Sequence, residues 1–259
     1  MAAILVLLGA ATLAMTAEGG YHQLKKYPFG AAAGSTREYF DYITVDSSAR
    51  RVYLSHGTEI KVLDADSGAV VGNIAGLKQD HGVALAPEFG RGFITDGGQG
   101  KVVIFDLKTF KTLGEAKADK DADSIVYDPV SKRVFAMNGD PNSCTVIDAK
   151  TGTIVETINL GGGPEFVVAD GKGTIYVNIE DKNELVAIDS KTLKIKSRWP
   201  VAPAGGPTAL AIDHEHRWLF SAGRNPQMLV VINADNGKVI QSFPSPVELM
   251  RLRMTPGRV

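Results

Sequence analysis

The chain has 259 residues, of which 44% are hydrophobic and 22% are charged, and its formal net charge at pH 7 is −1. This balance is typical of a globular protein with a buried core, and it excludes the basic bias of a nucleic-acid-binding protein. The single cysteine, Cys144, excludes an intramolecular disulfide. It starts an expected strand, where we predict a small buried or half-buried residue rather than a reactive nucleophile.

Residues 2–15 form an uncharged apolar run. The run is shorter than the roughly 20 residues that a membrane-spanning helix needs, and it suits the apolar region of a secretory signal peptide. Small residues near Ala17 offer a cleavage point, although the usual positive charges before the run are missing. We therefore predict a signal peptide over residues 1–17, a periplasmic or secreted protein, and no membrane anchor after cleavage. A buried core helix is the alternative.

One motif occurs five times along the chain. It consists of a hydrophobic pair, an Asp or Asn, and a polar turn, as in residues 146–152 (VIDAKTG). Its anchor residues, separated by 42, 42, 41 and 44 positions, are Asp64, Asp106, Asp148, Asp189 and Asn233. A period of about 40–45 residues with four strands per unit is the signature of a β-propeller blade. We predict an all-β fold, with five four-stranded antiparallel blades in one domain over residues 21–246.

Within each unit, the first strand is expected to be innermost and the second to carry one aromatic residue. The expected inner strands are Asp41–Asp46, His81–Ala86, Asp123–Asp128, Glu165–Asp170 and Thr208–Asp213. The recurring aromatics, predicted to pack between blades, are Tyr53, Phe93, Phe135, Tyr176 and Phe220. The turn after the third strand ends in Gly in three units, because Gly readily adopts a positive φ. Phe110 and Leu193 replace this Gly in the other two, so we expect those two turns to differ.

The two ends of the repeat region depart from the pattern. Tyr21–Gly30 resembles the fourth strand of a blade, and such a strand often closes a propeller ring. Residues 247–259 bring three arginines where a sixth inner strand is expected. Codons compatible with this tail, read in another frame, encode Gly-Ala-Asp-Ala-Ala-Ala-Tyr-Asp-Pro, which matches an inner strand. We therefore expect a frameshift or truncation and an open or incomplete ring; a natural basic tail is the alternative.

The repeats resemble the YVTN-type β-propeller family, the exported YncE-like proteins of bacteria. Residues Arg51–Gly57 and Arg133–Gly139 and the five turns carry this resemblance, which covers roughly residues 21–246. It implies a complete propeller of about seven blades, two more than the repeats present here. These motifs specify the blade and say little about function, since propellers carry many unrelated sites.

The strongest candidate site comes from one position shared by the five inner strands. That position is occupied by Asp41, His81, Asp123, Glu165 and Thr208. Inner strands line the central channel, so we expect these side chains to ring one channel mouth and to bind a ligand there. The first four are also candidate ligands of a divalent cation, the one cofactor considered. Alternatively, each side chain caps backbone N–H groups of a neighbouring blade.

Other polar residues are weaker candidates. His214 and His216 alternate in a turn without a third ligand nearby, so we interpret them as solvated. The run 161–163 (GGG) lacks the strand–helix context of a phosphate loop. The loops 140–142 and 180–183 belong to one rim and are candidates for lining a binding surface.

Two functions remain open. The absence of a catalytic motif and the near-uniform repeats favour an exported, non-enzymatic scaffold that binds a small molecule or a protein at one rim. The alternative is a metal-dependent, lactonase-like hydrolase or lyase with a cation at the channel mouth. A propeller that holds haem or a quinone is not supported, because no Cys-x-x-Cys-His motif occurs.

Overall fold

The computed structural model describes residues 25–34 and 39–245, and in these ranges twenty strands form five antiparallel sheets. The first sheet contains β1 (Ile43–Asp46), β2 (Arg51–Ser55), β3 (Glu59–Asp64) and β4 (Val70–Ala75). The second contains β5 (Asp80–Ala86), β6 (Arg91–Asp96), β7 (Lys101–Asp106) and β8 (Thr112–Lys117). The third contains β9 (Ala122–Asp128), β10 (Arg133–Asn138), β11 (Ser143–Asp148) and β12 (Ile154–Asn159). The fourth contains β13 (Pro164–Ala169), β14 (Thr174–Ile179), β15 (Glu184–Asp189) and β16 (Ile195–Pro200). The fifth contains β17 (Pro207–Asp213), β18 (Trp218–Arg224), β19 (Gln227–Asn233) and β20 (Val239–Pro244).

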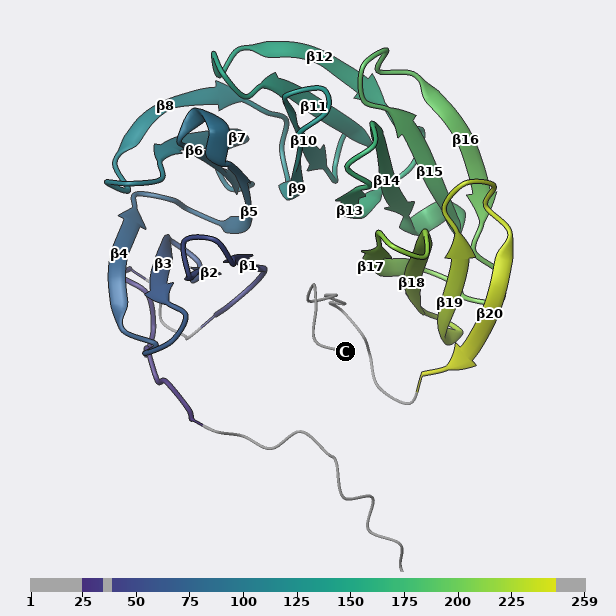
Figure 1. Cartoon of the computed structure of the whole chain (residues 1–259), viewed down its shortest axis with the longest axis horizontal. Helices are drawn as coiled ribbons and strands as arrows, with labels where there is room; N and C mark the ends of the chain where they lie inside the picture. Colours follow the sequence, from purple (N-terminus) through teal and green to yellow (C-terminus); the bar gives the residue numbers. More distant parts are fainter. Residues whose placement is uncertain (1–24, 35–38, 246–259) are drawn as a thin grey trace, which may run out of the picture.

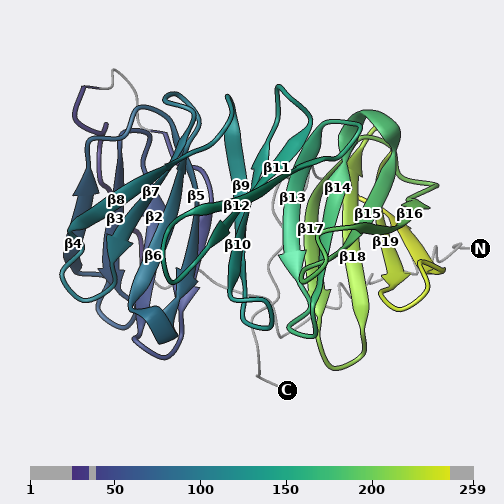
Figure 2. The ribbon, with the colours of Figure 1, turned by 90° about the horizontal axis from the view of Figure 1, so that it is seen from above.

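The sheets are arranged as blades around a common axis, which confirms the prediction of an all-β propeller with four-stranded antiparallel blades (Figure 1). The first strand of each sheet lies nearest the axis and the fourth lies outermost (Figures 1 and 2). In the described ranges, no strand of the first sheet pairs with a strand of the fifth, and the two sheets stand apart in Figure 1.

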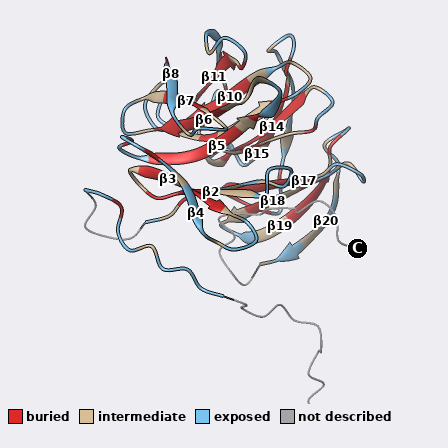
Figure 3. Cartoon of the chain, turned by 60° about the vertical axis from the view of Figure 1, so that its left-hand side comes forward, coloured by how far each residue is buried: buried red, intermediate tan, exposed pale blue. Residues whose placement is uncertain are grey.

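The middle strands of the second, third and fourth sheets are buried on both faces because each of these sheets packs between two others. All six residues of β14 (TIYVNI) are buried, whereas in the outer strand β12 only Ile158 is buried. Figure 3 shows another outer strand, β20, as largely exposed. A strand buried on both faces is continuously apolar, as β14 is apart from Thr174 and Asn178. Burial is therefore greatest in the middle strands of a sheet and least in its outermost strand.

Four hydrophobic clusters fill the spaces between successive sheets. The cluster between the first two sheets combines Tyr53 and Val62 with Val83 and Phe105. The ring centroids of Tyr53 and Phe105 lie 5.9 Å apart. The predicted packing role of the recurring aromatics is confirmed for four sheets, where all four residues are buried: Tyr53, Phe93, Phe135 and Tyr176. The fifth aromatic, Phe220, is only half-buried, since no described sheet packs beyond it.

The turns between the third and fourth strands are alike in all five sheets. The last turn residue donates its N–H to the anchor carbonyl over 2.8–2.9 Å in every sheet, including the two without Gly. Phe110 and Leu193 adopt φ values of 60° and 62° there, close to the 72° of Gly68. The expectation that these two turns would differ is therefore wrong. A left-handed non-Gly residue costs about 1–2 kcal/mol, and both side chains offset part of that cost by packing against the intersheet clusters.

The first sheet exposes two apolar side chains that are covered in the other sheets. Ile43 and Val45 on β1 are 41% and 50% exposed. The residues that correspond to Ile43 in the next sheets pack against the preceding sheet, as Val83 does. In the described part of the chain, no sheet precedes the first, so this face of β1 remains exposed.

The N-terminal segment differs from the prediction. Residues 25–30 form no strand, and Tyr27 donates its hydroxyl to the carbonyl of Ser67 over 2.9 Å, so that this part of Tyr21–Gly30 contacts the first sheet. The predicted signal peptide over residues 1–17 and the aberrant tail over residues 247–259 lie outside the described residues. A search of residues 25–34 and 39–245 finds no helix long and apolar enough to span a membrane.

Candidate functional site

The five predicted site residues all lie at the beginning of an inner strand, at the same end of the propeller. His81, Asp123, Glu165 and Thr208 are each the second residue of their strand, and Asp41 lies two residues before β1. Each chain segment enters its sheet at this end, so five equivalent positions face the axis. Their side chains, however, take three different arrangements.

Asp41, His81 and Asp123 converge from the first three sheets. The Nδ1 atom of His81 lies 2.7 Å from Oδ2 of Asp41 and 3.5 Å from Oδ1 of Asp123. One potential ligand atom from each of the three residues lies within 4.8 Å of the other two, and no other such group of His, Cys, Asp or Glu occurs in the described ranges. We call these three residues the axial cluster. Gly82 permits this approach, because a Cβ there would lie 2.9 Å from Ile125 on β9.

Tyr42 connects the axial cluster to the far side of the axis. Its hydroxyl donates to Oδ2 of Asp123 over 3.1 Å. Its ring meets the ring of Phe166 edge-on, with centroids 5.1 Å apart, so a residue of the first sheet contacts the fourth. Sequence reasoning missed Tyr42, although it directly follows a predicted site residue and occupies the same repeat position as Phe166.

Burial and charge both shift the ionisation of the axial cluster. Burial raises the pKa of Asp123 to about 6, and the charge of His81 opposes that rise. Burial disfavours the imidazolium form of His81, but the hydrogen bond that its Nδ1–H donates to Asp41 and the charges of Asp123 and Asp41 outweigh burial, so the pKa of His81 is raised. Burial and the nearby carboxylates also raise the pKa of Tyr42, which stays a protonated donor. The cluster therefore favours a proton on Nδ1 of His81, held between two carboxylates.

Glu165 and Thr208 do not join the axial cluster. Burial, followed by a hydrogen bond with Glu180, raises the pKa of Glu165 to about 8, and the nearby Arg224 opposes this rise. Arg224 itself binds Glu180, with Nη1 2.8 Å from Oε1. The hydroxyl of Thr208 donates to the carbonyl of Ala222 in its own sheet. A ring of five converging side chains, expected from the repeat, is therefore reduced to three.

The backbone of these positions is held by the preceding sheet. A hydroxyl or amide on one sheet donates to the carbonyl of an inner-strand residue on the next, as Ser55 does to His81. The other three donor–acceptor pairs are Thr95 with Asp123, Ser124 with Glu165, and Asn178 with Ala209. We call these four bonds the axial ties. Three of the donors, Ser55, Thr95 and Asn178, are the fifth residue of the second strand in their sheets. In the third sheet Met137 takes this position, and Ser124 on the inner strand supplies the hydroxyl instead.

The capping role considered for the predicted site residues belongs to two other carboxylates. Asp80 accepts the N–H of His56 in the preceding sheet over 3.0 Å, and Asp96 accepts those of Lys78 and Gln79. Burial raises the pKa of Asp80 to about 7. Asp80 directly precedes the predicted position His81 in the chain, so the sequence pattern alone could not separate the two roles there.

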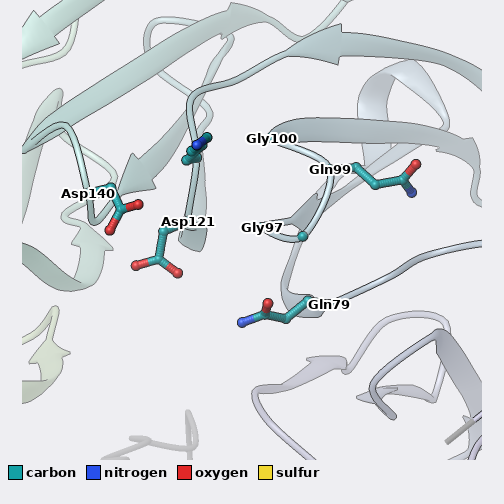
Figure 4. A pocket seen from close by; sticks show the side chains of 8 residues that line it. Gln79, Gly97, Gln99, Gly100, Asp121 and Asp140 are labelled. Atoms are coloured by element: carbon teal, nitrogen blue, oxygen red, sulfur yellow. The ribbon is translucent and has the colours of Figure 1, made fainter.

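An open depression of about 440 Å³ lies at the same end, between the second and third sheets (Figure 4). Four loops line this rim depression, with Gln79, Gly97–Gly100, Lys120, Asp121 and Asp140. Figure 4 shows the carboxylates of Asp121 and Asp140 on one side and the amide of Gln79 on the other. The predicted rim loop 140–142 thus contributes one lining residue.

His81 lies directly behind one wall of the rim depression. A Cβ on Gly97 would lie 3.1 Å from Nε2 of His81 and 3.1 Å from the carbonyl oxygen of Ala122. Nε2 is buried and has no hydrogen-bond partner among the described residues. Gly97 therefore lies between Nε2 of His81 and the rim depression.

The remaining predicted residues take structural positions. Cys144 is fully buried in the core between the third and fourth sheets, as expected. His216 is exposed in the turn before β18, with Nδ1 2.7 Å from Asp213, and His214 contacts the carbonyl of Asp170. His56 is buried, contacting Glu59 and the carbonyl of Gly30.

Two curated relatives share sequence with this chain. The proteins called "Uncharacterized protein YncE" of Salmonella typhi and Salmonella typhimurium are each 26% identical to it over 149 residues. The match covers 54% of this chain and 42% of each relative, so it spans less than half of their length. No protein-family model matches the chain.

Sequence and fold together fit a YncE-like propeller-type family. The likeness is weak in identity, and the five repeated four-stranded sheets agree with it. Both relatives are described only as uncharacterized, so the YncE-like fold brings no ligand or reaction with it. Function has to be argued from the axial cluster and the rim depression.

Proposed function

We propose that this chain is an exported, non-enzymatic binding protein that takes a small ligand at the axial end of the propeller. One observation carries the proposal: polar side chains from three successive sheets converge beside an open depression. Concave sites with a few convergent polar groups and perturbed ionisation are the usual form of small-molecule sites. The apolar run over residues 2–15 and the YncE-like fold support export.

A screen of thermal unfolding tests the binding function. We expect compounds that bind at the axial end to raise the Tm of the wild-type protein, and to lose this effect in Asp41→Asn, which weakens the hold on His81. Cell fractionation tests the export. A protein found only in the cytoplasm contradicts the export, and a ligand that stabilises both variants equally contradicts the axial site.

A second function is favoured by the geometry of the axial cluster. An imidazole and two carboxylates within 4.8 Å could hold a divalent cation such as Zn²⁺ or Mn²⁺. With a cation bound there, a metal-dependent, lactonase-like hydrolase or lyase becomes possible, since a bound cation polarises a carbonyl and activates water. Nδ1 of His81 would first have to lose the proton that it shares with Asp41 at 2.7 Å.

Calorimetry with metal chlorides separates the two functions. Cation binding to the wild-type protein that disappears in Asp123→Asn, together with lactone hydrolysis by the loaded protein, would favour the hydrolase. Ligand binding that persists in the presence of a chelator favours the binding protein.

A further inference from the structure

The end of the propeller opposite the axial cluster is built from the turns that lead into the second and the fourth strand of each sheet. Because every sheet is antiparallel and its first strand starts at the axial end, both turns emerge at the other end (Figure 2). We call the part of this end that belongs to the second, third and fourth sheets the basal arc. Six exposed lysines lie on it: Lys108, Lys111, Lys150, Lys172, Lys191 and Lys194.

The lysines follow the repeat and are confined to the three middle sheets. In these sheets the second residue after the turn anchor is a lysine: Lys108, Lys150 and Lys191. In the first and fifth sheets the same position is an acid, Asp66 or Asp235. These two acids bind Arg50 and Arg217, and Nη2 of Arg217 lies 2.9 Å from Oδ1 of Asp235. The sign of the charge at one repeated position therefore distinguishes the basal arc from the sheets on either side of it.

The ammonium groups of the basal arc are available to an external anion. None of the six lysines forms an ion pair within residues 25–34 and 39–245. Glu88 binds Lys132, and Asp128 and Asp170 are buried. The turn anchors of these sheets already accept N–H groups of their own turns: Asp106, Asp148 and Asp189. The outward-facing charges of the basal arc are therefore predominantly positive.

Exposed apolar side chains lie beside the lysines. Leu113 is the second residue of β8, and Ile154 and Val155 begin β12, so all three closely follow turns of the basal arc. In the second to fourth sheets, the described large hydrophobic side chains that are exposed are these three aliphatic ones. Phe110, the aromatic residue of these turns, packs against the cluster between the first two sheets. The surface therefore combines ammonium groups with aliphatic side chains.

We infer that the basal arc docks on the anionic surface of a phospholipid membrane. Each lysine is attracted by the negative potential of such a surface, and aliphatic side chains can enter the headgroup region. Lipid headgroups move laterally, so they can follow an arc whose spacing is set by the blades. A single-stranded nucleic acid would stack its bases on aromatic side chains, and the basal arc exposes aliphatic ones.

Docking through the basal arc leaves the opposite end of the propeller accessible. The axial cluster and the rim depression lie at that end, so a docked protein keeps them toward the solvent. The inference goes beyond the binding function proposed above and does not depend on it, because the two concern different residues at opposite ends of the molecule.

Flotation of vesicles in a density gradient tests the inference, because protein aggregates sink while vesicles rise. The probes are vesicles of pure phosphatidylcholine and vesicles with about 30% phosphatidylglycerol, which supplies the negative surface potential. We expect the 259-residue chain to bind the anionic vesicles about tenfold or more tightly than the neutral ones. The difference should disappear at about 0.5 M salt, where the Debye length falls below about 5 Å.

Two triple variants with the same change of charge provide the matched comparison. The first combines Lys108→Gln, Lys150→Gln and Lys191→Gln, and we expect it to bind anionic vesicles about tenfold or more weakly than the wild type. The control combines Lys78→Gln, Lys117→Gln and Lys120→Gln, at exposed positions of the axial end, and should bind within about twofold of the wild type. Both variants keep the apolar run over residues 2–15, so any binding through that run is the same in both.

A further variant tests the apolar side chains. Leu113→Thr combined with Ile154→Thr places β-branched residues at exposed strand positions, so we expect the fold to be retained. Binding to anionic vesicles should weaken by about threefold or more, because less apolar surface enters the headgroup region.

The inference is overturned if neutral and anionic vesicles bind equal amounts of protein, or if the two triple variants bind anionic vesicles equally. Binding of heparin or of a single-stranded oligonucleotide without binding of vesicles would show that the partner is another polyanion, and the membrane would then be the wrong partner. None of these results alters the ligand-binding function of the axial end, which the thermal-unfolding screen measures separately.

Discussion

Tyr42 determines much of the arrangement at the axis with one side chain. It extends from the first sheet to Asp123 in the third and Phe166 in the fourth. Its hydroxyl donates a hydrogen bond to the Asp123 carboxylate, whose charged form burial destabilises, since burial raises the pKa of Asp123 to about 6. One side chain of the first sheet thus contacts both the third and the fourth sheet.

We predict that Tyr42→Phe lowers the free energy of unfolding by about 1.5–3 kcal/mol, the usual cost of losing a hydrogen bond to a charged group. The ring remains, so the packing against Phe166 is retained. Urea denaturation measures the change. Tyr27→Phe is the control, because it removes an exposed hydroxyl that donates to Ser67 and should cost less than about 0.5 kcal/mol. Equal costs in the two variants would contradict the role of Tyr42.

Buried acids give the protein an unusual dependence of stability on pH. The pKa values of Asp123, Asp80 and Glu165 are raised to about 6, about 7 and about 8, with burial the first cause in each. The folded state therefore binds more protons than the unfolded state between about pH 4 and pH 8. Stability falls as pH rises through this window, by about 1.4 kcal/mol per pH unit for each extra proton. His81, whose pKa is raised above its ordinary value near 6.5, adds to the loss above that pH.

We predict that Glu165→Gln reduces this pH dependence. Glu165 faces Glu180, Asp123 and Arg224, and glutamine resembles its protonated form. The variant should match the wild type near pH 5 and be more stable at pH 8, where folding of the wild type has to protonate or bury a carboxylate that is ionised in the unfolded state. Denaturation at a series of pH values measures this. A parallel pair of stability curves would show that Glu165 ionises freely in the folded protein.

The sequence predicts the depth of the site residues along the axis but not the directions of their side chains. Equivalent repeat positions indicated that Asp41, His81 and Asp123 lie at the same end, and the structure brings these three together. Whether Glu165 turns toward them or toward Glu180 depends on Arg224, a residue of another sheet. Contacts between side chains of different sheets decide such choices, and a repeat pattern contains no information about them.

At the scale of the sheets, the second blade contains a compensated pair. Val52, Val134, Ile175 and Leu219 occupy the position on the second strand that Gly92 takes on β6. The residue opposite Gly92 is Phe105 on β7, where the other sheets have leucine or isoleucine. A Cβ on Gly92 would lie 2.1 Å from the ring of Phe105. The small residue and the large ring therefore share one volume.

We predict that Gly92→Val alone lowers the free energy of unfolding by about 1–3 kcal/mol through overpacking. Phe105→Ile alone should also destabilise, because it leaves a cavity in the core between the first two sheets. The double variant recreates the Val134–Ile147 pair of the third sheet. Its loss of unfolding free energy should be smaller than the sum of the losses in the two single variants. Strictly additive free energies from chemical denaturation would contradict the shared volume.

Element boundaries were largely predictable because the repeat fixes them. The predicted inner strand Thr208–Asp213 lies within one residue of β17, and His81–Ala86 lies within one residue of β5. The turns at Phe110 and Leu193 were not predictable in the same way. Residue preference indicated a different turn, whereas hydrogen bonding to Asp106 and Asp189 and packing between the sheets maintain the left-handed conformation.

At the scale of the whole molecule, the exposed face of β1 makes the chain prone to association. Ile43 and Val45 lie on a sheet face that packs against a neighbouring sheet elsewhere in the propeller. We predict that the 259-residue chain forms oligomers or aggregates, and that the pair Ile43→Thr and Val45→Thr reduces them. Light scattering after size-exclusion chromatography measures this. A monodisperse wild-type monomer would contradict the prediction.

The axial ties have a mechanical consequence. Each sheet is stiff, and one hydrogen bond near the propeller axis links it to the backbone of the next sheet. If one sheet tilts, the backbone of the next sheet therefore moves first near the axis. The hydrophobic clusters farther from the axis respond later. Such a linkage makes the centre more rigid than the circumference. Any adjustment to a molecule bound near the axis has to come from side-chain rotation or from the rim loops. The outer strands can vary in sequence without altering the geometry near the axis.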